Sequence, residues 1–122
     1  MNKDLVRRLY EFHTNQRHFE RLGEVFSADF VNTYLTAVST LVKGFPDVQF
    51  EVLQLVEEGE TVVVRWRWSG THTGEFRGYA PTGKKVGNEG VVIYTARDGK
   101  LVSSWTINDR LGVLQAIGAV SL

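Results

Sequence analysis

One acidic side chain near the C-terminus lies in a setting that suits acid–base chemistry. The run from Trp105 to Gly118 is typical of the end of a β-strand followed by a short helix. Since successive side chains of a strand alternate between its faces, Trp105, Ile107 and Asp109 are expected on one face. A carboxylate among apolar groups holds a proton more tightly, because desolvation disfavours its charged form. Asp109 is therefore a candidate catalytic residue that transfers protons near neutral pH.

Asp109 has a structural interpretation as well. Aspartate is a favoured N-cap, and this residue stands just before the apolar run that begins at Leu111. Asn108 could fill the same position. The catalytic role and the capping role are compatible, and the sequence leaves both open.

An aromatic set and one amide are candidates for binding a flat, mostly apolar ligand. Asn88 is the candidate polar anchor, and a buried, satisfied amide or a surface position is equally consistent with the sequence. The aromatic residues could instead fill a core. They are Trp66, Trp68, Trp105, Tyr94 and Tyr34.

The imidazoles do not predict a metal site. His13 and His18 are five residues apart, which is not the spacing that places two ligands on one helical face. His13 borders an apolar helical stripe and could reach a pocket, although a position on the helix surface is also consistent. His72 follows a predicted strand and is interpreted as structural. We therefore expect no metal and no cofactor.

Length and composition limit the class of protein. The chain has 122 residues, a formal net charge of zero and no cysteine. We expect one domain over residues 1–122, in a cytoplasmic protein without disulfides or thiolate chemistry. The segment Met1–Tyr10 lacks the apolar core of a signal peptide, and no run has membrane-spanning length. The balanced charge predicts neither nucleic-acid nor membrane binding.

Periodic patterns predict helices first and strands afterwards. Apolar residues at helical spacing predict a helix from about Lys3 to Arg17, a shorter stripe over Phe19–Phe26 and a largely covered helix over Phe30–Phe45. Runs rich in β-branched residues then predict four antiparallel strands joined by tight turns. This order indicates an α+β fold with helices on one face of the sheet. The predicted strands are Val48–Glu57, Glu60–Thr71, Lys84–Ala96 and Lys100–Asn108.

The second and third predicted strands differ in their patterns. In the second, Val62, Val64, Trp66 and Trp68 share the face that we expect toward the helices. The third has consecutive apolar residues over Val91–Tyr94, which predicts burial on both faces and a homodimer through the outer face of the sheet. We expect a bulge at Gly87 or Gly90.

Four short segments carry a family resemblance when taken together. They are Phe45–Val48, Trp66 with Gly70–Phe76, Pro81–Lys84, and Trp105 with Asp109–Gln115. At these spacings the region from about Ala28 to Val120 resembles the SnoaL-like polyketide cyclases of the NTF2-like superfamily. The resemblance implies a cone-shaped α+β barrel with a pocket between a curved sheet and a long helix, and a homodimer. It also implies that Asp109 handles the proton of an aldol ring closure, without metal or organic cofactor.

The sequence departs from this family at two places. Ser103 and Ser104 stand where a Glu-His pair is frequent, and Thr33 follows Asn32 where a histidine is frequent. The segment before Phe45 is also shorter. These changes remove imidazoles that could assist Asp109.

Two functional hypotheses follow. The first is a cofactor-independent enzyme, an aldol-type cyclase or isomerase, acting on a small hydrophobic substrate with a carbonyl group. Asp109 would move the proton, and Asn88 or a backbone amide would stabilise the developing negative charge. The second is a small-molecule binding or dimerisation module without catalytic activity. The position of Asp109 relative to a cavity distinguishes the two.

Overall fold

A computed structural model describes residues 1–120 of the chain, which begins with three short helical segments. The α-helix α1 (Asn2–Arg8) continues without a break into the π-helix η1 (Leu9–Thr14), and the 3₁₀-helix η2 (Phe19–Glu24) follows. The helix predicted from Lys3 to Arg17 is thus shorter and changes its winding. A π-helix is rare, and it frequently occurs at functional sites.

The long helix α2 (Ala28–Gly44) was predicted with nearly correct ends but with too much burial. It ends before Pro46, which cannot continue a helix. Of its residues only Val38 and Gly44 are fully buried, whereas Phe30, Tyr34 and Leu41 are partly exposed. The apolar stripe of α2 packs against the hydrophobic core with part of its surface and lines a cavity with the rest.

Four antiparallel strands follow α2 and pair in sequence order. They are β1 (Gln49–Glu58), β2 (Thr61–Thr71), β3 (Lys85–Arg97) and β4 (Lys100–Asn108), and the helix α3 (Arg110–Ala116) comes last. The α+β fold and the meander are confirmed, with strand ends within one residue of the prediction. None of the helices within residues 1–120 is long and apolar enough to cross a membrane.

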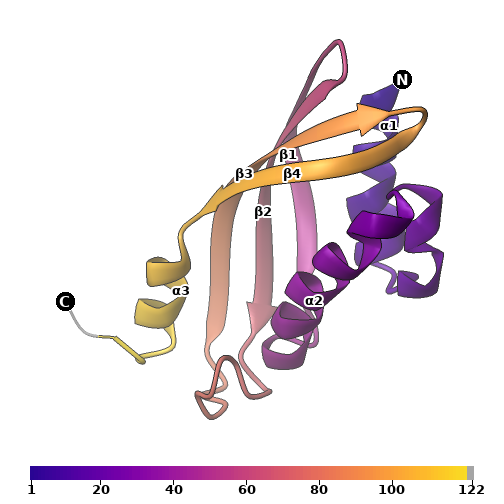
Figure 1. The fold of residues 1–122 in the computed structure, drawn as a ribbon. Coiled ribbons are helices and arrows are strands. Elements are labelled where there is room, and N and C mark those ends of the chain that lie inside the picture. Colours follow the sequence, from indigo (N-terminus) through magenta and orange to yellow (C-terminus); the bar gives the residue numbers. More distant parts are fainter. Residues whose placement is uncertain (121–122) are drawn as a thin grey trace.

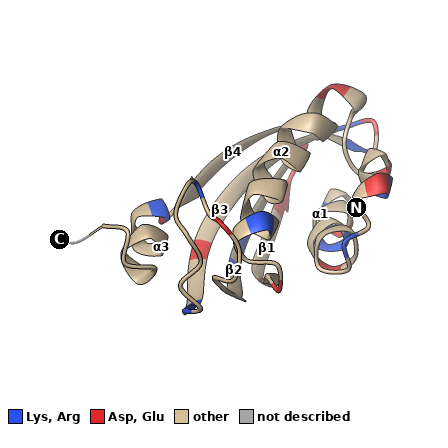
Figure 2. Cartoon of the chain, turned by 90° about the horizontal axis from the view of Figure 1, so that it is seen from below, with Lys and Arg blue, Asp and Glu red and all other residues tan. Residues whose placement is uncertain are grey.

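The sheet is strongly curved, and the helices lie on its concave side (Figure 1). The turn between β3 and β4 reaches the N-terminal helices, where the Leu101 backbone pairs with Val25 and Ser27 and the Lys100 ammonium donates to the Gly23 carbonyl. The helix α3 lies at the opposite end of the molecule from α1 (Figures 1 and 2). The space between these two ends is bounded by α2 and the sheet.

Burial alternates along both central strands. The predicted inner face of β2 is buried. On β3, Val92 and Tyr94 are buried, while Ile93 is 37% exposed. The prediction that β3 is covered on both faces is therefore wrong for the single chain, because its consecutive apolar residues divide between an inner and an outer face.

The irregularities of the sheet lie elsewhere than predicted. Register shifts occur between Val52 and Gln54 and between Thr95 and Ala96, and both Gly87 and Gly90 are regularly paired. A Cβ atom on Gly90 would lie 2.6 Å from the Trp66 indole. Gly90 thus makes room for the indole and does not form a bulge.

Candidate functional site

A cavity of about 320 Å³ lies between α2 and the concave face of the sheet. Residues from η1, α2, all four strands, the loop after β2 and the start of α3 line it. A volume of this size suits a small organic molecule. Five of the predicted binding residues line the cavity, namely Tyr34, Trp66, Trp68, Asn88 and Tyr94.

Two hydrogen-bonded pairs of hydroxyl groups lie in the cavity region. The Tyr10 and Tyr94 hydroxyls lie 2.7 Å apart, and the Tyr34 hydroxyl lies 2.7 Å from Thr14 Oγ1. Burial raises the pKa of all three phenols, and the neighbouring Tyr94 raises the pKa of Tyr10 further. The phenols are therefore neutral at ordinary pH and act as hydrogen-bond donors or acceptors, not as bases.

The Tyr10–Tyr94 pair has one more hydroxyl hydrogen than its mutual hydrogen bond uses. The pair has two hydroxyl hydrogens, and the mutual bond uses one of them. Neither hydroxyl has a second acceptor among the described residues, so one O–H remains without an acceptor there. Because both side chains line the cavity, a ligand oxygen can provide that acceptor.

Two more donors belong to this part of the molecule. Asn88 is only 8% exposed, lines the cavity and makes no side-chain hydrogen bond to another described residue. The buried Trp66 Nε1 likewise has no partner at hydrogen-bonding distance in the described part of the chain. It approaches the Tyr10 phenol closely enough to lower its pKa somewhat against the larger effect of burial.

Aromatic packing forms the apolar walls. The Trp66 ring meets Phe50 edge-on, with centroids 5.1 Å apart, and Phe50 in turn packs on Tyr10 at 5.2 Å. Trp68 packs on Phe45 at 5.0 Å. These contacts hold the aromatic side chains in fixed orientations, so the cavity is largely preformed.

The structure places Asp109 as the N-cap of α3. Its Oδ1 accepts a hydrogen bond from the Gly112 backbone N–H at 2.8 Å, and the residue is exposed. Asp109 is not among the described residues that line the cavity, although Asn108 and Arg110 on either side of it are. The capping interpretation is therefore confirmed, and the Asp109 side chain does not line the cavity in this conformation.

The face of β4 that lines the cavity is opposite to the face expected from the sequence. Trp105 is 57% exposed and Ile107 58% exposed, and both point away from the cavity. The cavity is lined from β4 by Ser104, Thr106 and Asn108. The assumption that the apolar row of this strand faces inward was wrong, because its small polar residues line the hollow interior. Trp105 is accordingly not part of the cavity.

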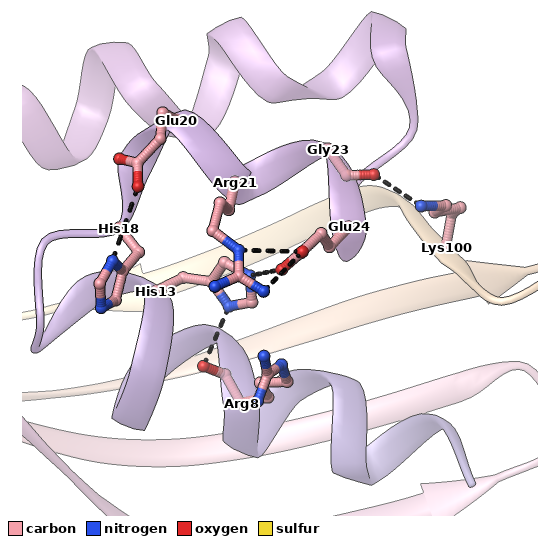
Figure 3. A network of polar contacts seen from close by, with 8 residues as sticks. All are labelled: Arg8, His13, His18, Glu20, Arg21, Gly23, Glu24 and Lys100. Atoms are coloured by element: carbon pink, nitrogen blue, oxygen red, sulfur yellow. Dashed lines mark hydrogen bonds and ion pairs between the residues drawn. The ribbon is translucent and has the colours of Figure 1, made fainter.

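His13 is buried, contrary to the surface position considered from the sequence, and it does not line the cavity. Figure 3 shows its ring between two acceptors from different segments. Nε2 lies 2.9 Å from Glu24 Oε1, and Nδ1 lies 3.2 Å from the Arg8 carbonyl oxygen. His13 thus joins η1 to η2. His72 is also buried, where Nδ1 accepts a hydrogen bond from Thr82, consistent with the predicted structural role.

Besides the polar residues of β4, sequence reasoning missed other polar cavity residues, among them Tyr10, Arg77 and Arg110. Tyr10 stands in the apolar stripe of the first helix and was interpreted only as part of it. Arg77 lies in the loop after β2, and Arg110 begins α3. An aromatic hydroxyl inside an apolar stripe could have indicated Tyr10, whereas no local pattern marks the two arginines.

Comparisons with known proteins agree with this architecture. The family model of the SnoaL-like polyketide cyclases matches residues 2–117. No curated protein sequence matches the chain significantly. Solved structures of similar fold align with this chain over nearly the full length of both chains.

A candidate SnoaL-like polyketide cyclase from Jannaschia sp. CCS1 is 25% identical, with a TM-score of 0.87 and coverage of 98% of this chain and 93% of that chain. AclR, a candidate hydroxylase from Streptomyces galilaeus, is 25% identical, with a TM-score of 0.86 and coverages of 98% and 97%. IdmH, a candidate polyketide cyclase from Streptomyces antibioticus, is 27% identical, with a TM-score of 0.85 and coverages of 97% and 99%. With its curved sheet, its long helix and the match to the family model, the chain belongs to the SnoaL-like polyketide cyclase family.

Proposed function

We propose that this protein is a cofactor-independent enzyme that binds a small, largely apolar carbonyl compound and catalyses an aldol-type cyclisation or an isomerisation. The observation that carries the proposal is the Tyr10–Tyr94 pair, which presents a neutral O–H without an acceptor inside an aromatic cavity. A donor of this kind stabilises the negative charge that develops on a carbonyl oxygen when a neighbouring carbon loses a proton.

The remaining cavity residues have distinct roles in this proposal. Trp66 and Trp68 hold the carbon skeleton of the substrate, as their fixed ring packing favours a flat ligand. Asn88 donates a second hydrogen bond from β3. Burial keeps the phenols neutral, so the proton acceptor is a different group.

Asp109 is the proposed proton acceptor, as the family resemblance implies. It stands at the rim, between two cavity-lining residues, and its carboxylate is exposed in the capped state. Breaking one exposed cap bond costs about 1 kcal/mol, which is small beside a catalytic barrier. Movement of the side chain from Gly112 toward the cavity is therefore part of the proposed cycle.

The test uses deuterium exchange at the α-carbon of 2-tetralone, followed by NMR in D₂O. Acid–base catalysis on a carbonyl compound accelerates this exchange whatever the natural substrate is. The Asp109→Asn variant retains a good N-cap residue and loses the base, whereas Asp109→Ser retains a cap without an amide. Both variants are expected to stay folded and to lose the acceleration. Normal exchange in folded Asp109→Asn would contradict the proposed role of Asp109.

A non-catalytic binding module is the second candidate, and the observed cap of Asp109 favours it. In that case 2-tetralone binds in the cavity, but its exchange rate equals that in buffer. Thermal shift measurements made alongside the exchange assay separate this outcome from a failure to bind.

We also propose that the protein forms a homodimer through the outer face of the sheet. Apolar residues align there across the strands, because Val56 pairs with Val63, Val63 with Ile93, and Ile93 with Trp105. Val56 is 49% exposed and Trp105 57% exposed. A contiguous exposed apolar row of this kind favours association with a second copy.

A further inference from the structure

The charged side chains that line the cavity within the described residues are both arginines, while the Asp109 carboxylate at the rim accepts the cap hydrogen bond of α3. Arg77 and Arg110 both line the cavity, and none of the lining residues within residues 1–120 is Asp or Glu. Both arginines are exposed, and neither forms an ion pair with another described residue. Arg21, Arg65 and Arg67, in contrast, all pair with glutamates. An apolar cavity whose charged groups share one sign favours ligands of the opposite sign.

The two arginines come from separate elements at the same end of the molecule. Arg77 belongs to the loop between β2 and β3, and Arg110 is the first residue of α3. This loop lies between α2 and α3 in both views (Figures 1 and 2), and the basic residue at the start of α3 is visible in Figure 2. The arrangement therefore brings the positive charge to the cavity from two sides.

Arg77 occupies a backbone position that does not favour arginine. It has a φ of 48°, and Gly78 after it has a φ of 86°. The backbones of Phe76 and Tyr79 exchange two hydrogen bonds around these residues, as in a type I′ turn. Asn-Gly is the preferred sequence for such a turn, so arginine at the first position is strained. Strain of this kind at a cavity indicates a functional residue.

We propose that the ligand carries a carboxylate or similar anionic group, which Arg77 and Arg110 bind at the mouth of the cavity. This inference rests on the proposed function and specifies its substrate class as apolar acids with a carbonyl group. The apolar body enters between the tryptophans, the carbonyl oxygen reaches the Tyr10–Tyr94 pair and the anion stays at the mouth. Guanidinium groups suit this task, because their planar donors match the two oxygens of a carboxylate.

Two fluorescent dyes with the same aromatic body test the proposal. They are 8-anilinonaphthalene-1-sulfonate, which is anionic, and N-phenyl-1-naphthylamine, which is its neutral counterpart. Fluorescence titrations compare both dyes on the wild type, Arg77→Asn, Arg110→Gln and the double variant. Arg8→Gln is the matched control, because Arg8 also lacks a carboxylate partner among the described residues and lies outside the cavity. Ala37→Trp fills the cavity and reports whether the dyes bind there.

The expected result is a selective loss of anion affinity. Each cavity arginine variant should bind the sulfonate roughly tenfold more weakly, since a hydrogen bond to a charged group is worth about one decade or more in affinity. The neutral dye should bind all arginine variants equally, and high salt should weaken binding of the sulfonate only. Arg77→Asn should also unfold at a higher temperature, because asparagine suits the turn. If Arg77 only stabilises the fold through its contact with the Phe76 ring, Arg77→Asn should unfold at a lower temperature and should bind the sulfonate as the wild type does.

Other outcomes separate the two proposals. Equal binding of both dyes, with no effect of the arginine variants, overturns the anion inference and leaves the proposed function intact. Failure of both dyes and of 2-tetralone to bind the wild type overturns the proposed function as well. Dye binding that persists in Ala37→Trp takes place outside the cavity and also counts against the inference.

Discussion

The hydroxyl oxygens of Tyr10 and Tyr94 lie 2.7 Å apart, although 84 residues separate them in the sequence. Tyr10 comes from the π-helix η1 and Tyr94 from the inner face of β3, so this contact joins the N-terminal helices to the middle of the sheet. Both residues line the cavity. The pair therefore contributes to stability and to the proposed binding of a carbonyl oxygen.

Removing one hydroxyl of the pair should affect both properties. We expect Tyr94→Phe to lower the free energy of unfolding by about 1–3 kcal/mol, because it leaves the buried Tyr10 hydroxyl without a partner. The double variant with Tyr10→Phe should lose less than the sum of the single losses. Urea unfolding measures the stability, and 2-tetralone titration should show about tenfold weaker binding. Tyr79→Phe is the control, since Tyr79 is 41% exposed and outside the cavity.

Two glycines of β3 offer a matched test of the cavity wall. A Cβ atom on Gly90 would lie 2.6 Å from Trp66 Cη2 and 2.8 Å from Cζ2, so Gly90→Ala must displace the indole. A Cβ atom on Gly87 would lie 3.6 Å from the Trp68 carbonyl oxygen, which is an ordinary van der Waals distance. We expect Gly90→Ala to lower stability by about 1–3 kcal/mol and to weaken ligand binding. Gly87→Ala should do neither, and equal effects in both variants would contradict this account.

The buried hydrogen bonds of His13 lead to a prediction about stability that does not depend on the cavity. Both ring nitrogens face acceptors, the Glu24 carboxylate and the Arg8 carbonyl, so both must donate for both hydrogen bonds to form. His13→Leu should lower the free energy of unfolding by about 1–3 kcal/mol, measured by urea titration. His18→Gln is the control, because His18 is partly exposed and its contact with Glu20 is 3.6 Å long. A larger loss of stability in His18→Gln than in His13→Leu would show that the buried hydrogen bonds of His13 do not make the larger contribution to stability.

The lowered pKa values of two carboxylates predict how the free energy of unfolding changes as the pH becomes acidic. The backbone N–H and hydroxyl of Thr71 hold the pKa of Asp47 below its ordinary value of 3.8. Hydrogen bonds from Arg21 and then from His13 lower the pKa of Glu24 from its ordinary value of 4.5. Because the folded-state pKa values are lower than the unfolded ones, this stabilisation is complete above the unfolded values and is lost as the pH falls through the folded values.

Urea unfolding at several pH values below about pH 5 should therefore show stability decreasing as the pH is lowered. Asp47→Asn should make this decrease smaller, because one of the two responsible carboxylates is absent. Asp98→Asn is the control, since Asp98 makes no side-chain hydrogen bond to another described residue and asparagine tolerates its φ of 52°. An unchanged pH dependence in Asp47→Asn would contradict the assignment.

The proposed dimer leads to a prediction about the outer face of the sheet. Trp105→Arg places a charge at the β4 end of the exposed apolar row and should convert a dimer to a monomer. Light scattering coupled to gel filtration measures the mass. Thr36→Arg is the control, because Thr36 is exposed on α2, outside the cavity and away from the sheet. A monomeric wild type would refute the dimer, and the apolar row would then require another explanation.

The sequence alone determined the order and type of the elements. Helical spacing in the first third of the chain and alternation in the rest were sufficient to predict α2, the four strands and the inner face of β2. These patterns are local, because each depends on neighbours a few residues apart. Four weak motifs at compatible spacing were then sufficient to indicate the family, which the family model confirms.

Only the tertiary structure decided which groups share the cavity. Alternation divides β4 into two faces but does not tell which one is inside, and the apolar choice placed Trp105 and Asp109 wrongly. This face of β4 borders the cavity and not the filled core, so Ser104 and Thr106 can line it without the cost of an unsatisfied buried group. The pairing of Tyr10 with Tyr94 depends on the curvature of the sheet and on the winding of η1. Such long-range geometry has no signature in a single sequence, because it arises from the packing of elements far apart in the chain.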